Sequence, residues 1–187
     1  MIRSPEQVSF DRITELVWLG SRICSVEDYV RLRALGIRAC VDMKAEGADP
    51  WGFEAFLWLP TPDHVPPRPT QLRMGLAFLR ECEAADMPVL VTCMGGFGRS
   101  STLVLAHLLA GRFRKEGPEA ALAFLSACRG SVSPNPAQIE AARLAAARRG
   151  RLVALRCDQA CPGCRRDYRC TPHRSGAARR RSSKQVV

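Results

Sequence analysis

Residues 88–92 limit the fold of this chain more than any other segment, because they lead through a glycine-rich turn directly into a helix pattern. The segment reads P-V-L-V-T, without alternation of apolar and polar residues, which is typical of a strand buried on both faces. The turn, residues 93–99, contains three glycines, and apolar residues then recur at helical spacing as far as Gly111. A buried strand followed at once by a helix predicts the α/β class, with a central, mostly parallel sheet flanked by helices.

The rest of the chain alternates between strand and helix patterns, in agreement with this class. Pro60 is expected to end one strand, because proline cannot continue a central ladder. Ser25 opens the first helix in a variant of the capping box, and Thr70 is expected to cap the second. Further strands are predicted at residues 16–20, 37–43 and 55–59, and further helices at residues 100–110, 118–129 and 136–149.

The composition is that of a globular domain with a basic extension. Of the 187 residues, 47% are apolar and 25% are charged, which is the balance of a folded domain. The formal net charge of +10 is uneven, because residues 151–187 hold nine arginines and one lysine against two aspartates. We therefore expect one compact domain over residues 1–150 and a basic, cysteine-rich tail over residues 151–187.

The sequence favours a cytoplasmic protein with no membrane insertion. No apolar run is long enough to cross a bilayer, and residues 1–11 lack the apolar stretch of a secretory signal. In the cytoplasm the nine cysteines are expected to be mostly reduced, so each is assessed first as a core residue, a metal ligand or a reactive thiol.

Residues 93–99 combine the features of an anion-binding loop with those of a nucleophile. Glycines allow the backbone to curl so that successive N–H groups point inward, toward the positive end of the following helix dipole. Cys93 at this position is expected to ionise readily, and Arg99 can grip two phosphate oxygens with its planar guanidinium. The predicted phosphate-binding residues are Met94, Gly95, Gly96, Phe97, Gly98 and Arg99.

Cleavage of a phosphate ester also needs a proton donor for the leaving oxygen. Asp63, in the segment P-T-P-D-H, lies 30 residues before Cys93, a separation that one helix and one strand fill. Both residues would then lie on loops at the carboxyl edge of neighbouring parallel strands, where α/β sheets bind ligands. Asp49 is a weaker candidate, because it precedes the third predicted strand instead of following it.

The pattern C-x5-R between a strand and a helix resembles the signature loop of the protein-tyrosine phosphatase superfamily. The form C-M-G-G-F-G-R-S is most similar to the small dual-specificity branch, of the kinase-associated phosphatase type, and the acid loop matches as well. The resemblance covers residues 13–149. It implies that Cys93 is the nucleophile, Arg99 the phosphate clamp, and Asp63 the general acid and then the general base. It also implies that Ser100 stabilises the departing thiolate, and that the chemistry needs no cofactor.

One position departs from the family pattern. Thr92 precedes the cysteine, where the family usually has a histidine that orients the loop, so we expect weakened activity instead of none. The expected function is hydrolysis of phosphate monoesters, mainly protein phosphotyrosine and also phosphoserine or phosphothreonine, by a monomer. Two alternatives stay open: a non-protein substrate, such as an RNA 5′-phosphate or a small phosphorylated metabolite, and a catalytically weak phospho-binding module.

The tail contains four cysteines whose spacing permits, but does not require, a structural zinc site. A disulfide within C-P-G-C and a tail without a bound metal are the alternatives, and binding of its arginines to nucleic acid is the weaker expectation. The candidate zinc ligands are Cys157, Cys161, Cys164 and Cys170.

The other cysteines and two of the histidines are expected to have structural roles. His64 is interpreted as a loop residue and His107 as a helix-packing residue. Gln138 is interpreted either as a residue that orients water or as a plain surface glutamine. The cysteines expected to be small buried side chains are Cys24, Cys40, Cys82 and Cys128.

Overall fold

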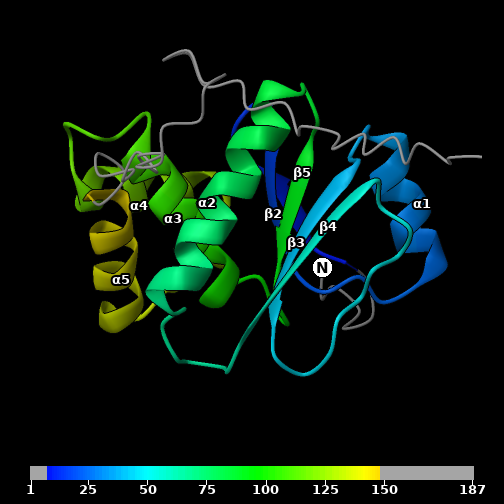
Figure 1. Ribbon diagram of the computed structural model, residues 1–187, viewed down its shortest axis with the longest axis horizontal. Helices are drawn as coiled ribbons and strands as arrows, with labels where there is room; N and C mark the ends of the chain where they lie inside the picture. The colour runs from blue at the N-terminus through cyan, green and yellow to red at the C-terminus, as the bar shows by residue number, and fades with distance from the viewer. Residues whose placement is uncertain (1–7, 148–187) are drawn as a thin grey trace, which may run out of the picture. The chain divides into compact units, whose positions relative to one another are not determined.

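A five-stranded sheet forms the centre of the protein, whose computed structural model describes residues 8–147 (Figure 1). The sheet order is β1-β2-β5-β3-β4. β1 is antiparallel to β2, and the other neighbours pair in parallel. The strands are β1 Phe10–Arg12, β2 Val17–Gly20, β3 Ala39–Lys44, β4 Ala55–Thr61 and β5 Val89–Thr92.

The helices of the described residues cover both faces of this sheet, which confirms the predicted α/β architecture. In Figure 1, α1 lies on one side of the sheet and α2 to α5 lie on the other. Their bounds are α1 Val26–Ala34, α2 Pro69–Ala84, α3 Arg99–Ala110, α4 Pro118–Cys128 and α5 Pro136–Ala147.

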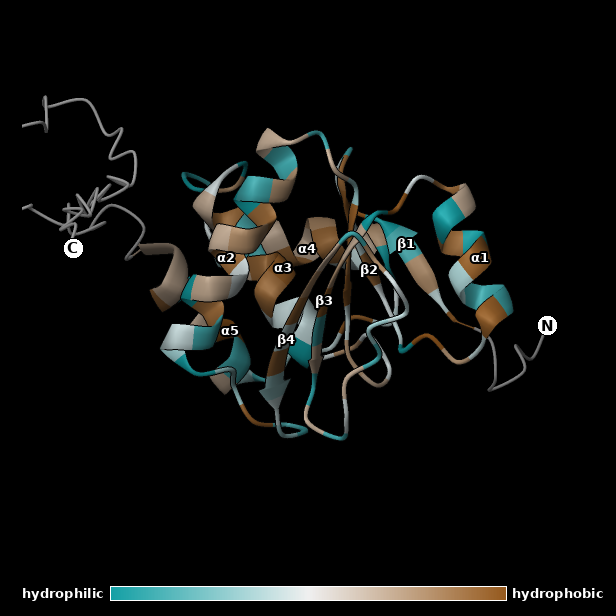
Figure 2. Ribbon diagram, turned by 45° about the vertical axis from the view of Figure 1, so that its right-hand side comes forward, coloured by the Kyte–Doolittle hydropathy of each residue, from teal (hydrophilic) through white to brown (hydrophobic). Residues whose placement is uncertain are grey.

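The two faces of the sheet contribute to two separate apolar clusters. Successive residues of a strand point to opposite faces, so Val89 and Val91 of β5 pack with the α2 and α3 side while Leu90 packs toward α1. α3 lies deepest, because every residue from Arg99 to Leu109 is buried. Figure 2 shows α3 as largely hydrophobic between the sheet and the outer helices. A helix enclosed in this way gives the loop before it a fixed starting point.

The expectation that Pro60 ends its strand is wrong. β4 continues through Pro60 to Thr61. β4 is an edge strand, and its register with β3 shifts between Asp42 and Lys44, so Pro60 does not stand opposite a paired residue. Proline is tolerated at such a place because no central ladder needs its missing N–H.

Helix starts are predicted with mixed success. Ser25 caps α1 as expected, and its side chain accepts a hydrogen bond from the Asp28 backbone N–H at 3.2 Å. Thr70, however, is not a cap, because α2 already begins at Pro69 and its N-cap is Arg68. Proline is favoured at the first helical position because its φ suits the helix, so α2 begins at Pro69, before the threonine.

The carboxyl ends of β3, β4 and β5 lie at one edge of the sheet, at the lower end in Figure 1. The loops after these strands therefore meet there, as predicted for Asp63 and Cys93. None of the described helices is long and apolar enough to cross a membrane. The proposed boundary at residue 150 and the tail lie outside the described residues.

Candidate active site

Cys93 lies at the base of a loop that joins the central strand β5 to the buried helix α3. Its side chain is buried, and its Sγ atom accepts a hydrogen bond from the backbone N–H of Gly96 at 3.3 Å. The Ser100 hydroxyl lies 3.2 Å from the same sulfur. Residues 93–99 are called the cradle below, and the sulfur lies within hydrogen-bond distance of one cradle N–H and of the Ser100 hydroxyl.

The curl of the cradle depends on Gly96. Its φ of +76° lies in the left-handed region, where an L side chain is strained. A Cβ atom there would also lie 2.7 Å from the backbone of Gly20 at the end of β2. Glycine is therefore required twice at this position, by its backbone conformation and by the close approach of a neighbouring strand.

Arg99 opens α3 and is almost fully buried, at 1% exposure. Its Nη1 atom donates to the Thr61 carbonyl at 3.0 Å and to the Glu46 carboxylate at 2.9 Å. Its Nε atom lies 3.2 Å from Oδ1 of Asp63. The guanidinium is thus fixed by the ends of β3 and β4 before any phosphate binds.

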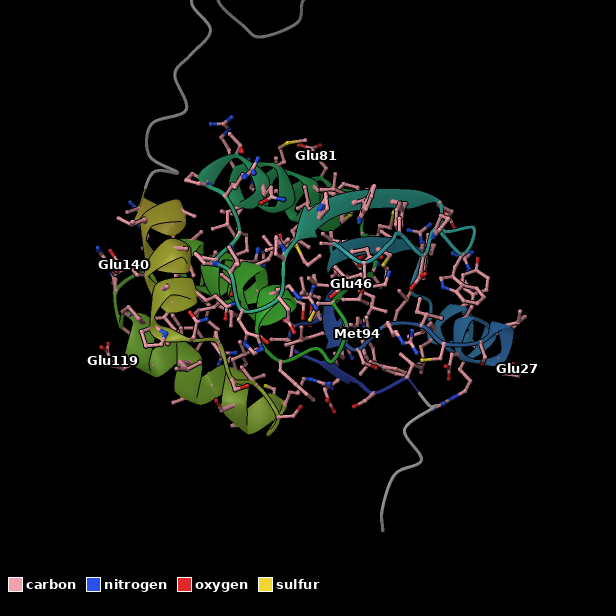
Figure 3. The ribbon with its side chains drawn as sticks, turned by 90° about the horizontal axis from the view of Figure 1, so that it is seen from below. Glu27, Glu46, Glu81, Met94, Glu119 and Glu140 are labelled. Atoms are coloured by element: carbon pink, nitrogen blue, oxygen red, sulfur yellow. The ribbon has the colours of Figure 1, made fainter. Side chains whose placement is uncertain are left out.

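Glu46 is a site residue that the sequence analysis missed. It lies after β3, and Figure 3 shows it near Met94 of the cradle, whereas Glu27, Glu81, Glu119 and Glu140 lie at the periphery. The hydrogen bond from Arg99 lowers the pKa of Glu46. Burial alone would lower the pKa of Arg99, but the contacts with Glu46, Cys93 and Asp63 raise it overall, so Arg99 stays a cation.

Asp63 follows β4, in the loop of residues 62–66, called the acid loop below. Its carboxylate accepts a hydrogen bond from the His64 backbone N–H at 3.1 Å and is 59% exposed. The structure brings Asp63 and the cradle together around one hollow of about 260 Å³. This hollow is lined by Asp63, His64, Cys93, Met94, Gly95, Phe97, Gly98, Arg99, Ser133, Asn135 and Gln138.

Asp49, the other candidate acid, belongs to a different cluster. Its Oδ2 atom forms an ion pair with Lys44 Nζ at 2.8 Å, and the same nitrogen lies 2.5 Å from Oδ2 of Asp42. Burial raises the pKa of Asp42, while its bonds to Lys44 act in the opposite direction. Asp49 therefore neutralises a buried lysine and does not line the hollow.

Arg129, at the end of α4, supports the cradle from behind and was also not predicted. Its guanidinium donates to the carbonyls of Gly96 at 3.3 Å and of Gly95 at 3.2 Å. It also contacts Ser9 Oγ at 3.1 Å and Asp11 at 2.6 Å. These bonds tie the backbone of the cradle to the end of α4 and to the start of the described chain.

Several structural interpretations are confirmed and others are corrected. His107 packs in α3 with its Nε2 atom 3.0 Å from Glu83, and Cys40 and Cys82 are buried, as expected. Cys24 is exposed and Cys128 only partly buried, so those two predictions are wrong. Gln138 is no surface residue, because only 2% of it is exposed.

Thr92, which stands where the resembling family usually has a histidine, is buried at the end of β5. Its side chain interacts with the Cys40 thiol of the neighbouring strand β3, and this interaction acts to lower the pKa of that thiol. Desolvation raises the pKa of Cys40 well above its ordinary value, so this thiol stays neutral. Threonine at this position therefore bonds to the sheet core.

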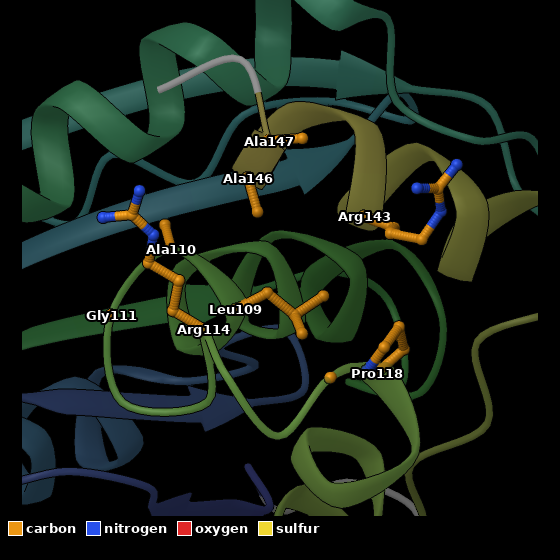
Figure 4. A pocket seen from close by; sticks show the side chains of 9 residues that line it. Leu109, Ala110, Gly111, Arg114, Pro118, Arg143, Ala146 and Ala147 are labelled. Atoms are coloured by element: carbon orange, nitrogen blue, oxygen red, sulfur yellow. The ribbon is translucent and has the colours of Figure 1, made fainter. Parts of the chain in front are cut away.

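A larger hollow, of about 730 Å³, lies at the opposite end of α3 from the cradle. Arg114 and Arg143 lie on either side of it in Figure 4, with Leu109, Ala146 and Ala147 between them. No cysteine, histidine or carboxylate is among the described residues that line it, so the reactive groups are gathered in the smaller hollow.

The predicted zinc ligands Cys157, Cys161, Cys164 and Cys170 lie outside the described residues. Within residues 8–147, no three His, Cys, Asp or Glu side chains are grouped so as to hold a metal ion.

Comparisons with known proteins point to one family. The family model of the dual specificity phosphatase catalytic domain matches residues 17–146. Tyrosine-protein phosphatase vhp-1 of Caenorhabditis elegans is 28% identical over 127 residues, or 66% of this chain, and the match spans only 19% of that protein's length.

Two solved structures share the fold. Tk-PTP in its active form has a TM-score of 0.65 at 24% identity, over 75% of this chain and 97% of that one. PTPMT1 in complex with PI(5)P has a TM-score of 0.61 at 24% identity, over 74% and 94% of the two chains.

Proposed function

The chain belongs to the dual specificity phosphatase catalytic-domain family, and from this premise we propose that it hydrolyses phosphate monoesters through a cysteinyl-phosphate on Cys93. The observation that carries the proposal is the convergence on one hollow of a buried thiol with the Gly96 N–H donated to it, the Arg99 guanidinium and the Asp63 carboxyl group. Phosphatases of this family need no cofactor for the chemical step.

In the first step the Cys93 thiolate attacks phosphorus, and an S–P bond forms while the bond to the leaving oxygen breaks. Arg99 and the cradle N–H groups hold the equatorial oxygens. Asp63, protonated for this step, gives its proton to the leaving oxygen, which departs as an alcohol or a phenol.

In the second step water replaces the sulfur. Asp63, now a carboxylate, accepts a proton from the water as its oxygen bonds to phosphorus, and the S–P bond breaks to release the thiolate. The Ser100 hydroxyl lies 3.2 Å from Cys93 Sγ, where it can donate to this departing charge. Phosphate then leaves, and the enzyme returns to its starting state.

We propose phosphotyrosine in proteins as the preferred substrate, on two features of the hollow. Arg99 is the one Arg or Lys among the described residues lining it, which suits a single phosphate better than a polyphosphorylated group. Phe97, at 48% exposure, and Met94, at 36%, offer apolar surface at the rim for an aromatic leaving group.

Turnover measurements test this proposal. The full chain should release phosphate from an aryl phosphate and from a phosphotyrosine peptide, and vanadate should block the reaction. Cys93→Ser should lower turnover by at least about a thousandfold yet keep phosphopeptide binding. Cys24→Ser, at an exposed thiol away from the hollow, should leave turnover unchanged.

Parallel assays distinguish the alternatives. Phosphoserine and phosphothreonine peptides, PI(5)P vesicles, an RNA 5′-phosphate and small phosphorylated metabolites are compared with the phosphotyrosine peptide. Faster release from a non-protein substrate would overturn the preference for protein, and tight binding without any release would identify a phospho-binding module.

A further inference from the structure

The segment of residues 133–138, which leads into α5, contacts both functional loops. The Ser133 backbone N–H donates to the Phe97 carbonyl of the cradle at 3.0 Å. The Asn135 side-chain amide donates to the His64 carbonyl at 2.8 Å, and the Gln138 side-chain amide donates to the Val65 carbonyl at 3.3 Å. Two side-chain amides from one segment thus hold two consecutive carbonyls of the acid loop.

The orientation of both amides is fixed by a reciprocal cap at the start of α5. The Asn135 N–H donates to Gln138 Oε1 at 2.9 Å, and the Gln138 N–H donates to Asn135 Oδ1 at 2.9 Å. Because each carbonyl oxygen is engaged by a backbone donor, each NH₂ group must face the acid loop. Gln138 is also buried against Gly98, where a Cβ atom would lie 3.0 Å from Gln138 Oε1.

The acid loop gains little from packing of its own side chains. The His64 side chain is 91% exposed and the Asp63 side chain 59% exposed. His64 also has a φ of +58°, a conformation that a non-glycine residue keeps only when its surroundings impose it. Both carbonyls that receive the amides belong to this strained turn or follow it directly.

We propose that Asn135 and Gln138 are positioning residues that hold the acid loop closed over the cradle before substrate binds, so that Asp63 is already placed to donate its proton. The proposal rests on the function assigned above to Asp63. It also gives Gln138 a role other than orienting water, since both ends of its amide are engaged within the protein.

The side-chain amides of Asn135 and Gln138 are called the clamp of the acid loop below. The chemistry predicts which substrates depend on this clamp. A poor leaving group, such as the phenolate of phenyl phosphate, needs the proton of Asp63, whereas p-nitrophenolate leaves well without it. A loosened acid loop should therefore lower turnover of phenyl phosphate by about 10- to 100-fold, the usual cost of a small misplacement of a catalytic group. Turnover of p-nitrophenyl phosphate should change little.

Asn135→Asp and Gln138→Glu test the proposal, because each keeps the oxygen that caps α5 and replaces the NH₂ donor with an acceptor. Ala137→Asp is the matched control, since it adds the same charge at an exposed position of the same helical turn. Asn135→Ser, which keeps a capping oxygen without the reach of the amide, provides a second variant if the charged one folds poorly.

Three measurements decide the outcome. The two amide variants should lose phenyl phosphate turnover selectively, should lose nothing further when combined with Asp63→Asn, and should still bind tungstate, because Arg99 and the cradle are unchanged. An equal loss on both aryl phosphates, or an additive loss with Asp63→Asn, would overturn the clamp.

Hydrogen exchange separates failure of the clamp from failure of the proposed function. In the free protein, the backbone N–H groups of His64 and Val65 should exchange faster in Asn135→Asp and Gln138→Glu than in the unsubstituted chain. Their exchange rates should be unchanged in Ala137→Asp. Unchanged exchange in the amide variants would refute the clamp even if turnover were normal. Faster exchange in a chain with no turnover on any substrate would support the clamp and refute the phosphatase assignment.

Discussion

At the residue scale, the hydroxyl of Ser100 is expected to control the second chemical step. It lies 3.2 Å from Cys93 Sγ, and a donor there stabilises the thiolate that leaves when the S–P bond breaks. Ser100→Ala should slow breakdown of the cysteinyl-phosphate by about 100- to 1,000-fold, and should slow its formation much less. Rapid mixing of Ser100→Ala with p-nitrophenyl phosphate should then show a burst of one equivalent of p-nitrophenolate. The control variant Ser131→Ala, at an exposed position, should show no larger burst than the unsubstituted chain. Slower formation without a burst would contradict this role.

Glu46 makes a pH-dependent prediction at the same scale. Arg99 lowers the pKa of Glu46 from 4.5, so the ion pair stabilises the fold above that value and is lost as the pH falls through the lowered one. Glu46→Gln should therefore melt at a lower temperature than the unsubstituted chain at pH 7, and the difference should shrink as the pH falls below 4.5. Thermal melts at several pH values measure this. Because Glu46 is 43% exposed, added salt should also reduce the difference, and a gap that persists at low pH would contradict the ion pair.

Residues that act through local sequence could be predicted, and those that act through space could not. Cys93, Arg99 and the cradle glycines lie within seven consecutive residues, so their spacing already indicated an anion loop. Glu46 lies 53 residues from Arg99 along the chain, and the Gln138 amide reaches a carbonyl 73 residues away. The parallel pairing of the strands brings Glu46 to Arg99, and the packing of α5 against α3 and α2 brings Gln138 to the acid loop.

At the scale of elements, the end of α4 and the cradle are expected to be one mechanical unit joined by Arg129. Arg129→Met would leave the bound carbonyls of Gly95 and Gly96 and the Asp11 carboxylate without their donor. We expect a loss of about 3 kcal/mol in the free energy of unfolding and weaker tungstate binding. Urea unfolding and calorimetry measure the two effects.

The control for Arg129 is Arg143→Met on α5, which breaks an exposed ion pair with Glu140 inside one helix. Surface pairs of this kind contribute about 0.5 kcal/mol, so stability should hardly change. Similar losses in the two variants would mean that the position of Arg129 behind the cradle has no special importance.

The elements themselves were largely predictable, and each error has a physical cause. The strand, turn and helix around Cys93 have strong local patterns, and β5 is central and buried as its unbroken apolar run indicated. The end of β4 was misplaced because the sequence of one strand does not tell whether it lies at an edge, where Pro60 is tolerated. β1 was not predicted, since three residues give too short a pattern.

At the scale of the whole molecule, residues 8–147 supply both the apolar core and every residue of the proposed mechanism. We therefore propose that residues 1–150 fold and react without the basic tail. A chain ending at residue 150 should melt within a few degrees of the full chain and hydrolyse p-nitrophenyl phosphate at a similar rate. A large loss of stability or turnover would show instead that residues 151–187 belong to the catalytic domain.

The same truncation tests the zinc prediction for the tail. Four thiols can hold one tetrahedral zinc, and Cys157, Cys161, Cys164 and Cys170 lie within the deleted segment. If these four thiols hold zinc, the full chain purified without chelator or oxidant carries about one equivalent of it and the truncated chain almost none. Less than about a tenth of an equivalent in the full chain would exclude the site. Since every group of the proposed phosphoryl transfer lies within residues 8–147, removal of the zinc should leave turnover of p-nitrophenyl phosphate unchanged.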